Sequence, residues 1–488
     1  MTETFNHFKQ PDASSAFATL ALPASQLANL TQLGYHTMTP VQAASLPLAL
    51  AGHDLIVQAK TGSGKTAAFA LVLLNNLERA AKPSQNAEPE AQPTGPRFAV
   101  QALVLCPTRE LADQVTMEIR RLARSEDNIK TLTLCGGAPM HGQKASLAHG
   151  AHIVVGTPGR IIDHLTRGHL TLDALNTLVL DEADRMLDMG FIDDIAQVVK
   201  HCPEQRQTLL FSATYPEGIA ELGARFLRTP KEVKLKELHA QSKIEQRCYE
   251  VIEVDRLDAV GKLLNHFRPA STLAFCNTRQ QCRDLVDVLR AQGFEALALH
   301  GELEQRDRDQ VLVQFANRSC SVLVATDVAS RGLDIAQLAA VINVDVSPDP
   351  QVHIHRIGRT GRADEQGLVL TLVSLDEMGS IGKIEAAQGT ESEWHPLGEL
   401  TAQPGGRLLP PMRTLHITGG RKDKIRPGDV LGALTGEAGF TAAQVGKINV
   451  NEFSTYVAVD RAIAAEAVKR LSAAKVKGKK VKVRLLTE

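Results

Sequence analysis

One segment of the chain has the composition of a phosphate-binding loop: Ala59-Lys-Thr-Gly-Ser-Gly-Lys-Thr66, which lies between an apolar run and an amphipathic one. Where a strand passes into a helix, the backbone N–H groups of Thr61–Thr66 can surround a phosphate. The Lys65 amine would reach the β- and γ-phosphates, and the Thr66 hydroxyl would bind Mg²⁺. Ala59 replaces the usual first glycine. The alternative is an incidental glycine-serine loop, but the strand–loop–helix context favours the phosphate site.

A second chemical group is the acidic run Asp181-Glu-Ala-Asp184, which follows the apolar residues Thr177–Leu180. In a parallel sheet, Asp181 would lie at the same edge as the phosphate loop. It would hold Mg²⁺ through bound water, and Glu182 would orient or deprotonate an attacking water. Three carboxylates in four residues also fit an acidic helix cap. Together with the phosphate loop, they favour nucleoside triphosphate hydrolysis.

The second half of the chain has no phosphate loop, but it contains the basic run His355-Arg-Ile-Gly-Arg-Thr-Gly-Arg362. Arginines spaced three apart among glycines suit contact with the charge on a transferring phosphoryl group better than they suit a scaffold. A solvated basic loop and a contact to a nucleic-acid backbone are the alternatives. We prefer the phosphoryl role because it explains why a second domain without a nucleotide loop is present.

The elements that must position these groups are short apolar runs that alternate with amphipathic stretches. This alternation predicts βαβ units and a mainly parallel sheet. The pattern restarts after about residue 247, so we expect two similar α/β halves. The predicted strands are Asp54–Gln58, Ala102–Cys106, Thr131–Cys135, His152–Val155, Thr177–Leu180 and Thr208–Phe211, then Thr272–Cys276, Ala296–Leu299, Ser321–Ala325, Val341–Val344 and Leu368–Val373.

Polar and Pro/Gly-rich stretches divide the chain into domains. Residues 81–96 contain four prolines and predict a solvent loop within the first domain. We expect an N-terminal tail at 1–16, a first domain at 17–230, a linker at 231–246, a second domain at 247–390, a hinge at 391–411 and a C-terminal domain at 412–488.

The C-terminal domain shows the order β-α-β-β-α-β, which is shared by RNA-recognition folds and by many unrelated domains. From Pro411 onward the sequence holds fifteen Lys and Arg against seven Asp and Glu, a net charge of +8, while the first 410 residues carry −9. A basic tail on an acidic body indicates a nucleic-acid module, with a solvated surface as the alternative. The predicted strands are Thr414–Thr418, Val445–Val450, Thr455–Val459 and Lys480–Leu485, and the helices lie near Pro427–Leu434 and Ala462–Ala473.

Composition excludes several classes of protein. The chain has 488 residues, of which 43% are hydrophobic, which supports globular packing over disorder. No run of eighteen apolar residues predicts a transmembrane helix, and the N-terminus has no secretory pattern. Seven scattered cysteines without a C-x-x-C pair disfavour a disulfide framework or a zinc site. We expect a cytoplasmic protein with reduced thiols and no membrane contact.

Taken in order along the chain, these motifs resemble the DEAD-box family of ATP-dependent RNA helicases, from about Phe17 to Ser374. The family includes the Ala59 variant of the loop. The resemblance implies two tandem RecA-like domains, ATP and Mg²⁺ as cofactors, and Gly34–Gln42 as the Q motif, with Gln42 on the adenine edge and Tyr35 stacked on the ring. Implied nucleotide-binding residues are Phe17, Tyr35, Gln42, Thr61, Gly62, Ser63, Gly64, Lys65, Thr66 and Asp334.

The same resemblance assigns further roles by motif. Lys65, Glu182, Arg359 and Arg362 would be catalytic, with the two arginines on the γ-phosphate. Thr66 and Asp181 would hold the metal. Ser212, Thr214 and His355 would couple hydrolysis to domain closure. Implied RNA-facing residues of the two core domains are Arg109, Gly137, Thr157, Arg160, Asn277, Thr326 and Arg331.

Met412–Asp429 and Val445–Val450 resemble the C-terminal RNA-binding domain of the DbpA subfamily. That resemblance implies binding to 23S rRNA and to precursors of the large (50S) ribosomal subunit, by a monomer. The tail lacks an aromatic-rich strand motif; Phe453 and Tyr456 are its aromatics near the expected sheet position, so we expect contacts from lysine and arginine. The candidates are Arg421, Lys422, Lys424, Lys477 and Lys479.

The resulting hypothesis is an RNA helicase that locally unwinds ribosomal RNA during subunit assembly. One alternative is an ATP-gated RNA clamp or assembly scaffold with little unwinding activity, which needs the same motifs. Another is an unrelated P-loop ATPase such as a DNA translocase, which the Q motif and the acidic tetrad disfavour.

Overall fold

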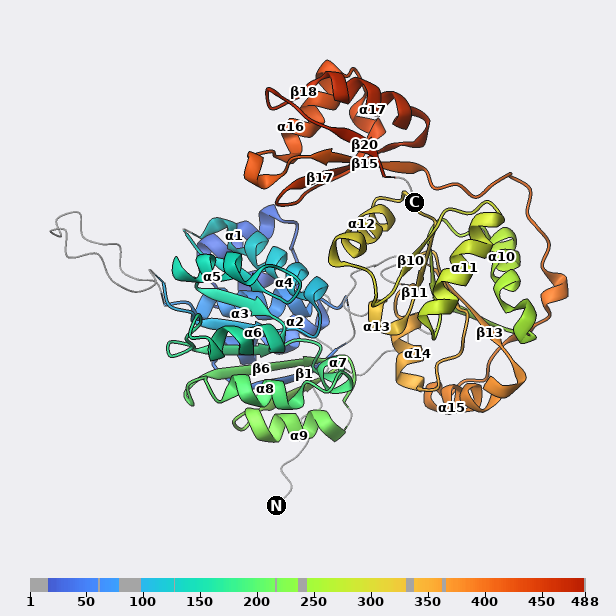
Figure 1. The fold of residues 1–488 in the computed structure, drawn as a ribbon. Coiled ribbons are helices and arrows are strands. Elements are labelled where there is room, and N and C mark those ends of the chain that lie inside the picture. Colours follow the sequence, from blue (N-terminus) through green and yellow to red (C-terminus); the bar gives the residue numbers. More distant parts are fainter. Residues whose placement is uncertain are drawn as a thin grey trace. The chain divides into compact units, whose positions relative to one another are not determined.

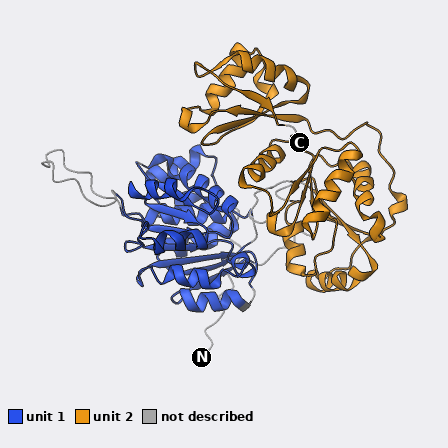
Figure 2. Ribbon diagram, viewed as in Figure 1, with its two compact units in different colours: residues 1–238, 332–334 blue, residues 239–331, 335–488 orange. Residues whose placement is uncertain are grey.

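The computed structural model describes residues 16–59, 62–78, 98–126, 128–215, 217–235, 244–330, 338–361 and 366–486. The chain divides into two compact units (Figure 2). Unit 1 comprises residues 1–238 with 332–334, and unit 2 comprises 239–331 with 335–488. Unit 1 contains one parallel sheet, and unit 2 contains a second parallel sheet and the C-terminal domain (Figure 1).

The first sheet has seven parallel strands in the order β3-β4-β2-β5-β6-β1-β7. Its strands are β1 Leu55–Gln58, β2 Ala102–Leu105, β3 Thr131–Leu134, β4 Ile153–Gly156, β5 Thr177–Leu180, β6 Gln207–Ser212 and β7 Lys231–Lys234. Its helices are η1 Phe17–Thr19, α1 Ala24–Gln32, α2 Pro40–Leu50, α3 Lys65–Asn76, α4 Arg109–Leu122, η2 Ala123–Ser125, α5 Met140–Ala148, α6 Pro158–Thr166, α7 Ala183–Asp188, α8 Ile192–Val199 and α9 Glu217–Phe226.

Continuous apolar runs form these strands because helices cover both faces of the sheet. Alternate residues point to opposite faces. Leu55 and Val57 pack in one core cluster together with α2, α3 and α4, while Ile56 packs in the other with α6, α8 and α9. The central strands are buried along their whole length. This double burial fixes the sheet edge on which the motif loops stand.

The second sheet repeats the first. Its order is β10-β11-β9-β12-β13-β8-β14. When the strands of each domain are numbered along the chain, both sheets have the order 3-4-2-5-6-1-7. This confirms the prediction of two similar α/β domains. The strands are β8 Ile244–Glu250, β9 Thr272–Phe275, β10 Ala296–Leu299, β11 Val322–Ala325, β12 Ala340–Asn343, β13 Gly367–Val373 and β14 Trp394–His395. The helices are η3 Glu253–Asp255, α10 Arg256–Phe267, α11 Arg279–Ala291, α12 Gln305–Ala316, α13 Asp327–Ser330, α14 Pro350–Ile357, η4 Leu375–Glu377, α15 Met378–Gln388 and η5 Leu397–Glu399.

Two edge strands lie in segments that we predicted to be connections. β7 occupies the start of the predicted linker 231–246 and pairs with β1. β14 lies in the predicted hinge 391–411 and pairs with β8. Both are short and mostly exposed, with Val233 the one buried residue of β7. An edge strand with one buried side chain has no apolar run, so its sequence resembles that of a loop.

The C-terminal domain has a four-stranded antiparallel sheet in the order β16-β17-β15-β20, with α16 and α17 on one face (Figure 1). The predicted element order is present. The last strand is shorter than predicted, and a small ribbon, β18–β19, precedes it. The elements are β15 Met412–Thr418, η6 Arg421–Asp423, α16 Pro427–Gly432, η7 (a π-helix) Ala433–Glu437, η8 Ala442–Gln444, β16 Val445–Val450, β17 Ser454–Asp460, η9 Arg461–Ile463, α17 Ala464–Ala473, β18 Lys475–Val476, β19 Lys479–Lys480 and β20 Val483–Leu485.

Within unit 2, the C-terminal domain is attached to the second parallel-sheet domain by more than its connection. Glu295, which precedes β10, accepts from Arg413 at 3.1 Å and from Arg461 at 2.6 Å. The fully buried hydroxyl of Thr414 lies 2.7 Å from Ser319 Oγ. We call this contact the Glu295 clamp. It joins two modules that the sequence presents as separated by a hinge.

The described helices include none with the length and apolar character needed to cross a membrane. All seven cysteines are free thiols, and six of them are buried, while Cys202 is half-buried.

Candidate functional site

The loop between β1 and α3 carries the phosphate-binding candidates. Gly62 and Gly64 have φ values of 80° and 92°, which a residue with a Cβ rarely adopts. Lys65 is 6% exposed, and its Nζ donates to the Ala59 carbonyl at 2.8 Å. Thr66 is the second residue of α3. The backbone therefore turns N–H groups and one buried amine toward the start of a helix, which suits a phosphate.

The Q motif supports this loop from α2. Thr39 caps that helix, and its Oγ1 donates to the Ser63 carbonyl at 2.7 Å. Gln42 is 1% exposed, and its Nε2 donates to the Gly64 carbonyl at 3.1 Å. A Cβ on Gly64 would lie 2.6 Å from that nitrogen. In this structure the Gln42 amide thus holds the phosphate loop in place. The sequence predicted a contact with adenine for Gln42 and did not predict this second role.

Two aromatic residues predicted at the nucleotide pack against each other. Phe17 is buried in the core, and its ring meets Tyr35 edge-on at 6.3 Å between centroids. The Tyr35 hydroxyl donates to Glu118 at 2.7 Å. Burial, and then this carboxylate, raise the pKa of Tyr35 to about 12. Tyr35 is half-buried and stays neutral and hydrogen-bonded.

At the end of β5, two carboxylates meet the phosphate loop. Asp181 is 2% exposed, and burial raises its pKa to about 7, although Lys65 opposes the shift. The Glu182 N–H donates to Asp181 Oδ1 at 3.0 Å. Glu182 has a left-handed φ of 51°, and its Oε2 lies 3.1 Å from Arg185 Nη1. A divalent cation would offset the cost of the buried Asp181 charge, so these residues fit Mg²⁺.

Asp184 joins the acidic run to the end of β6. Its Oδ2 accepts from the Ala213 N–H at 3.1 Å, and from the Thr214 N–H at 2.9 Å and the Thr214 hydroxyl at 3.0 Å. The Ser212 hydroxyl donates to the Thr214 carbonyl at 2.6 Å. The acidic run after β5 and residues 212–214 at the end of β6 therefore form one hydrogen-bonded unit, so that a displacement of one strand end also moves the other.

The residues predicted to face RNA in the first domain follow β2, β3 and β4. Arg109 begins α4, and its guanidinium fills the space beside Gly137, where a Cβ would meet it at 1.9 Å. Thr157 caps α6. Arg160 Nη1 donates to Ala138 O and to Gln143 Oε1, both at 2.9 Å. By strand order, these residues gather on one side of the sheet edge and the phosphate loop lies on the other.

The prediction that the motif arginines make a poor scaffold is wrong for Arg356. Its side chain is 1% exposed. It donates to both carboxylate oxygens of Asp327 at 2.7 Å, to the Asp345 carbonyl at 2.7 Å and to Asn277 Oδ1 at 3.1 Å. Its guanidinium also lies 5.0 Å from the centre of the Phe275 ring. Arg356 therefore ties together the loops after β9, β11 and β12.

The remaining candidates of the second domain stand on the same edge. Asn277 follows β9, and its side chain is engaged by Arg356. Thr326 follows β11 and is 8% exposed, and Arg359 follows α14 and is 5% exposed. His355, in α14, is half-buried. Four predicted residues lie outside the described part of the chain: Thr61, Arg331, Asp334 and Arg362.

Sequence reasoning missed a buried ionic group beside this edge. Arg256 is 2% exposed and donates to the Val344 carbonyl at 2.7 Å and to Glu377 at 2.8 Å. Asp345 lies 3.4 Å from it and accepts from the Asn277 N–H at 2.7 Å. Burial raises the pKa of Asp345. An arginine at the start of an amphipathic helix carries no pattern that identifies it as buried.

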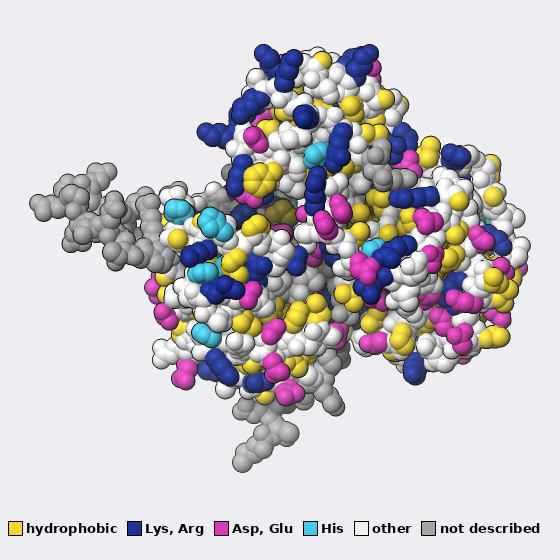
Figure 3. Space-filling view, in the orientation of Figure 1, with side chains coloured by type: hydrophobic (Ala, Val, Ile, Leu, Met, Phe, Trp, Pro, Cys, Tyr) yellow, Lys and Arg dark blue, Asp and Glu magenta, His cyan; other side chains and the backbone are white. Residues whose placement is uncertain are grey.

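The basic residues predicted in the tail are exposed. Lysine and arginine side chains gather on the surface of the C-terminal domain (Figure 3). Lys422 pairs with Glu452 at 3.2 Å, and Lys477 lies 3.9 Å from Asp429 and donates to the Lys424 carbonyl. The five predicted residues, Arg421, Lys422, Lys424, Lys477 and Lys479, are all exposed.

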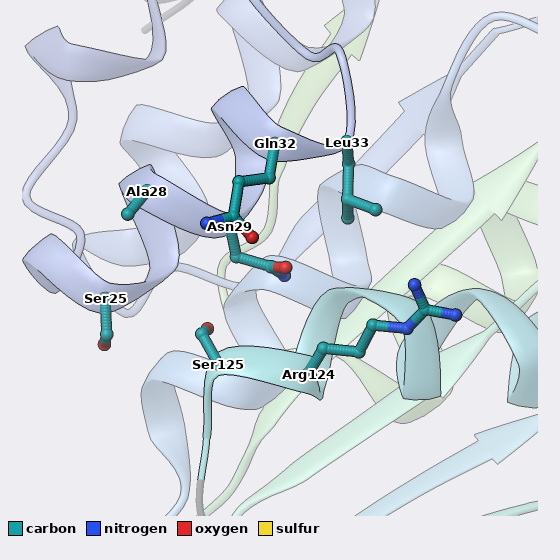
Figure 4. Close-up of a pocket in the computed structure, with 7 residues that line it drawn as sticks. All are labelled: Ser25, Ala28, Asn29, Gln32, Leu33, Arg124 and Ser125. Carbon is teal, nitrogen blue, oxygen red and sulfur yellow. The ribbon is translucent and has the colours of Figure 1, made fainter.

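A separate surface pocket lies between α1 and η2 (Figure 4). Asn29 Nδ2 donates there to the Leu122 carbonyl at 2.8 Å and so caps α4. The pocket stands at the opposite end of α4 from Arg109 and takes no part in the site. Its lining is Ser25, Ala28, Asn29, Gln32, Leu33, Arg124 and Ser125. Among the described side chains, no three His, Cys, Asp or Glu groups are arranged to hold a metal ion.

Family comparisons agree with this geometry. The DEAD/DEAH box helicase family matches residues 39–222, the helicase conserved C-terminal domain matches 255–364, and the DbpA RNA-binding domain matches 414–485. The ATP-dependent RNA helicase DbpA of Escherichia coli is 51% identical over 475 residues, which cover 97% of this chain and 100% of that protein. The chain belongs to the DEAD-box RNA helicases, in the DbpA subfamily. It is therefore an ATP-dependent RNA helicase, as the motifs predicted.

Other DEAD-box relatives match about three quarters of the chain. The ATP-dependent RNA helicase CshA of Listeria monocytogenes is 42% identical over 383 residues, which cover 78% of this chain and 70% of that one. The solved structure of Saccharomyces cerevisiae Dbp5 bound to RNA and ADP BeF3 aligns with a TM-score of 0.69 at 27% identity, covering 78% of this chain and 96% of that chain. These likenesses confirm the tandem parallel-sheet fold of this DEAD-box helicase.

Proposed function

We propose that this DEAD-box helicase acts as a monomer in the cytoplasm, where it locally unwinds or remodels 23S rRNA during assembly of the 50S subunit. The observation that carries the proposal is the third domain. It matches the DbpA RNA-binding domain over residues 414–485 and concentrates a net charge of +8 on an otherwise acidic chain. That charge supplies affinity for RNA that the acidic core lacks.

The first domain would bind ATP and orient the attacking water. Lys65 and the N–H groups from Thr61 to Thr66 would hold the phosphates, with the loop kept in shape by the buried Gln42 amide. The Thr66 hydroxyl and Asp181 would hold Mg²⁺, which neutralises phosphate charge when bound. Glu182, directed by its left-handed backbone and by Arg185, would take the proton of the attacking water.

The second domain would complete the site when ATP and RNA are bound. Arg359 and Arg362 would contact the γ-phosphate, and Arg356 would keep their loop in place through its buried bonds. Ser212 and Thr214, of which Thr214 is hydrogen-bonded to Asp184, would couple ATP hydrolysis to domain closure on the RNA. His355 would take part in the same coupling.

RNA would run along the carboxyl ends of the strands. Phosphate and sugar contacts would make the core indifferent to base sequence and able to use the 2′-OH. The tail would choose the target. The residues proposed to contact RNA in the core are Arg109, Gly137, Thr157, Arg160, Asn277, Thr326 and Arg331.

The proposal is tested by the ATPase rate of the full chain against increasing concentrations of poly(U), total ribosomal RNA and a fragment from the peptidyl-transferase region. We expect activation by the fragment at far lower concentration than by poly(U). Equal activation by all three RNAs would remove the ribosomal assignment. Glu182→Gln should keep ATP and RNA binding while losing turnover. A strand-displacement assay on a short duplex separates unwinding from an ATP-gated clamp.

A further inference from the structure

The open face of the C-terminal sheet is turned to the second helicase domain. Thr414 and His416 stand two residues apart on β15, and His416 pairs with Tyr456 on β17 at 5.2 Å between ring centres. The buried Thr414 hydroxyl lies 3.2 Å from Asn317 Nδ2 of that domain. The charge of Arg306 in α12 contributes to lowering the pKa of His416, after burial and Arg484.

As a consequence, the aromatic residue on that face cannot receive a base. Tyr456 is 4% exposed, whereas Phe453 is 63% exposed. Phe453 stands in the turn between β16 and β17, outside the covered face. The C-terminal domain therefore offers one large aromatic ring to solvent, and it lies at the tip of a hairpin.

This hairpin tip is held firmly against the loop that follows β15. The N–H groups of Arg421 and Lys422 donate to the carbonyls of Asn451 at 2.8 Å and Glu452 at 3.0 Å. A Cβ on Gly420 would lie 2.3 Å from the Asn451 carbonyl oxygen, so a glycine is needed for this approach. The backbone thus fixes two cationic residues beside the turn that carries the exposed ring.

Lys422 shows how the ring and the cations are related. Its Nζ lies 4.7 Å from the centre of the Phe453 ring and 3.2 Å from the Glu452 carboxylate. The lysine and its partner are about 60% exposed, and an exposed ion pair of this kind is weak. An RNA phosphate can therefore replace Glu452 as the partner of Lys422 without a large loss.

We propose that Phe453 is a stacking platform for one unpaired base of the target RNA, with Arg421 and Lys422 on the flanking phosphates. Every base offers a π-face to an aromatic ring, and a neighbouring phosphate suits the adjacent cations. This inference rests on the proposed RNA-targeting role of the C-terminal domain. It adds a readout of unpaired bases to a domain that the sequence suggested would use charge alone.

The test is a binding titration of the full chain with a hairpin RNA that carries 2-aminopurine in its unpaired loop, and with a blunt, fully paired RNA of the same length. Phe453→Leu should weaken hairpin binding about tenfold and abolish the change in 2-aminopurine fluorescence. Phe453→Tyr should restore both. The matched control is Trp394→Leu, which removes an aromatic ring that is 40% exposed in the second domain and should change neither.

Two further readouts separate this inference from the proposed function. The slope of binding against salt should be unchanged in Phe453→Leu, since no charge is lost. Its ATPase rate at saturating poly(U) should equal that of the unaltered chain. Hairpin binding within twofold of the unaltered chain, or an equal loss on the blunt duplex, would overturn the stacking role. If the unaltered chain shows no RNA-stimulated ATPase, the proposed function itself fails.

Discussion

The structure indicates that Arg356 stabilises the second helicase domain and does not act on a phosphate. The substitution Arg356→Lys tests this role. Lysine keeps the charge and can keep one contact with Asp327. It loses the second Asp327 bond and the bonds to the Asp345 carbonyl and to Asn277. We therefore expect the second helicase domain to lose stability while its charge balance is unchanged.

The magnitude follows from those three bonds. A net hydrogen bond is worth about 1 kcal/mol and one to a charged group about 1.5–3 kcal/mol. With the carboxylate bond at about 1.5–3 kcal/mol and the two bonds to neutral acceptors at about 1 kcal/mol each, the loss should be roughly 3–5 kcal/mol. This agrees with the cost of breaking a buried ion pair, about 3–5 kcal/mol. With a urea m-value of about 2 kcal/mol per M, the unfolding midpoint should fall by roughly 2 M.

The assay can report on this domain alone. The chain has one tryptophan, Trp394, in strand β14 of the second sheet, so tryptophan fluorescence in urea follows the unfolding of that domain. The control is Arg279→Lys, at an ion pair with Glu302 that is about half exposed, where we expect less than about 1 kcal/mol. If Arg356→Lys leaves the midpoint unchanged but abolishes ATP turnover, Arg356 acts on the nucleotide and the scaffold argument is refuted.

Three further predictions concern the loop, the clamp and the buried acid. Gly64→Ala should weaken binding of a fluorescent ATP analogue more than tenfold, because its φ is 92° and a Cβ would meet a buried amide, whereas Gly52→Ala, at φ 85° in open space, should not; equal effects would contradict this. Glu295→Gln should speed tryptic cleavage at Arg407 severalfold by loosening the clamp, and an unchanged rate would mean that the clamp adds no rigidity. Asp181 takes up its proton at about pH 7 when folded, against an ordinary pKa of 3.8, so the stability of the ligand-free chain should fall as pH rises from 4 to 7. Asp181→Asn should remove that slope in urea unfolding, and parallel curves for the two proteins would disprove the shift.

The sequence predicted well wherever a pattern repeats or a motif demands a special backbone. The central strands are buried along their whole length and mostly apolar because both faces are covered, so their positions were visible as runs. The glycines of the phosphate loop could also be predicted, because the left-handed backbone at Gly62 and Gly64 favours glycine over other residue types. The acidic run followed a strand, and parallel topology then placed it at the correct edge.

The sequence could not predict which polar residues become buried. Arg356 and Arg359 look alike in the motif, and nothing in it indicates that Arg356 hydrogen-bonds to three residues in three different loops. Nothing around Glu295 indicates that two arginines more than a hundred residues later will meet it. Strands β7, β8 and β14 were also missed. β7 and β14 are edge strands, which need backbone bonds on one side and few apolar side chains, and β8, which begins within the predicted linker, is mostly polar and has two buried residues. These features depend on contacts between distant segments, which composition does not record.

The Glu295 clamp has a consequence for how long one RNA stays with the enzyme. Ion pairs and a buried hydroxyl fix the C-terminal domain to the second helicase domain. An RNA that is bound by the C-terminal domain therefore remains attached when the first helicase domain releases it. Rebinding of the same molecule is then intramolecular, at an effective concentration on the order of millimolar. Several rounds of ATP hydrolysis can thus act on one RNA molecule before it diffuses away.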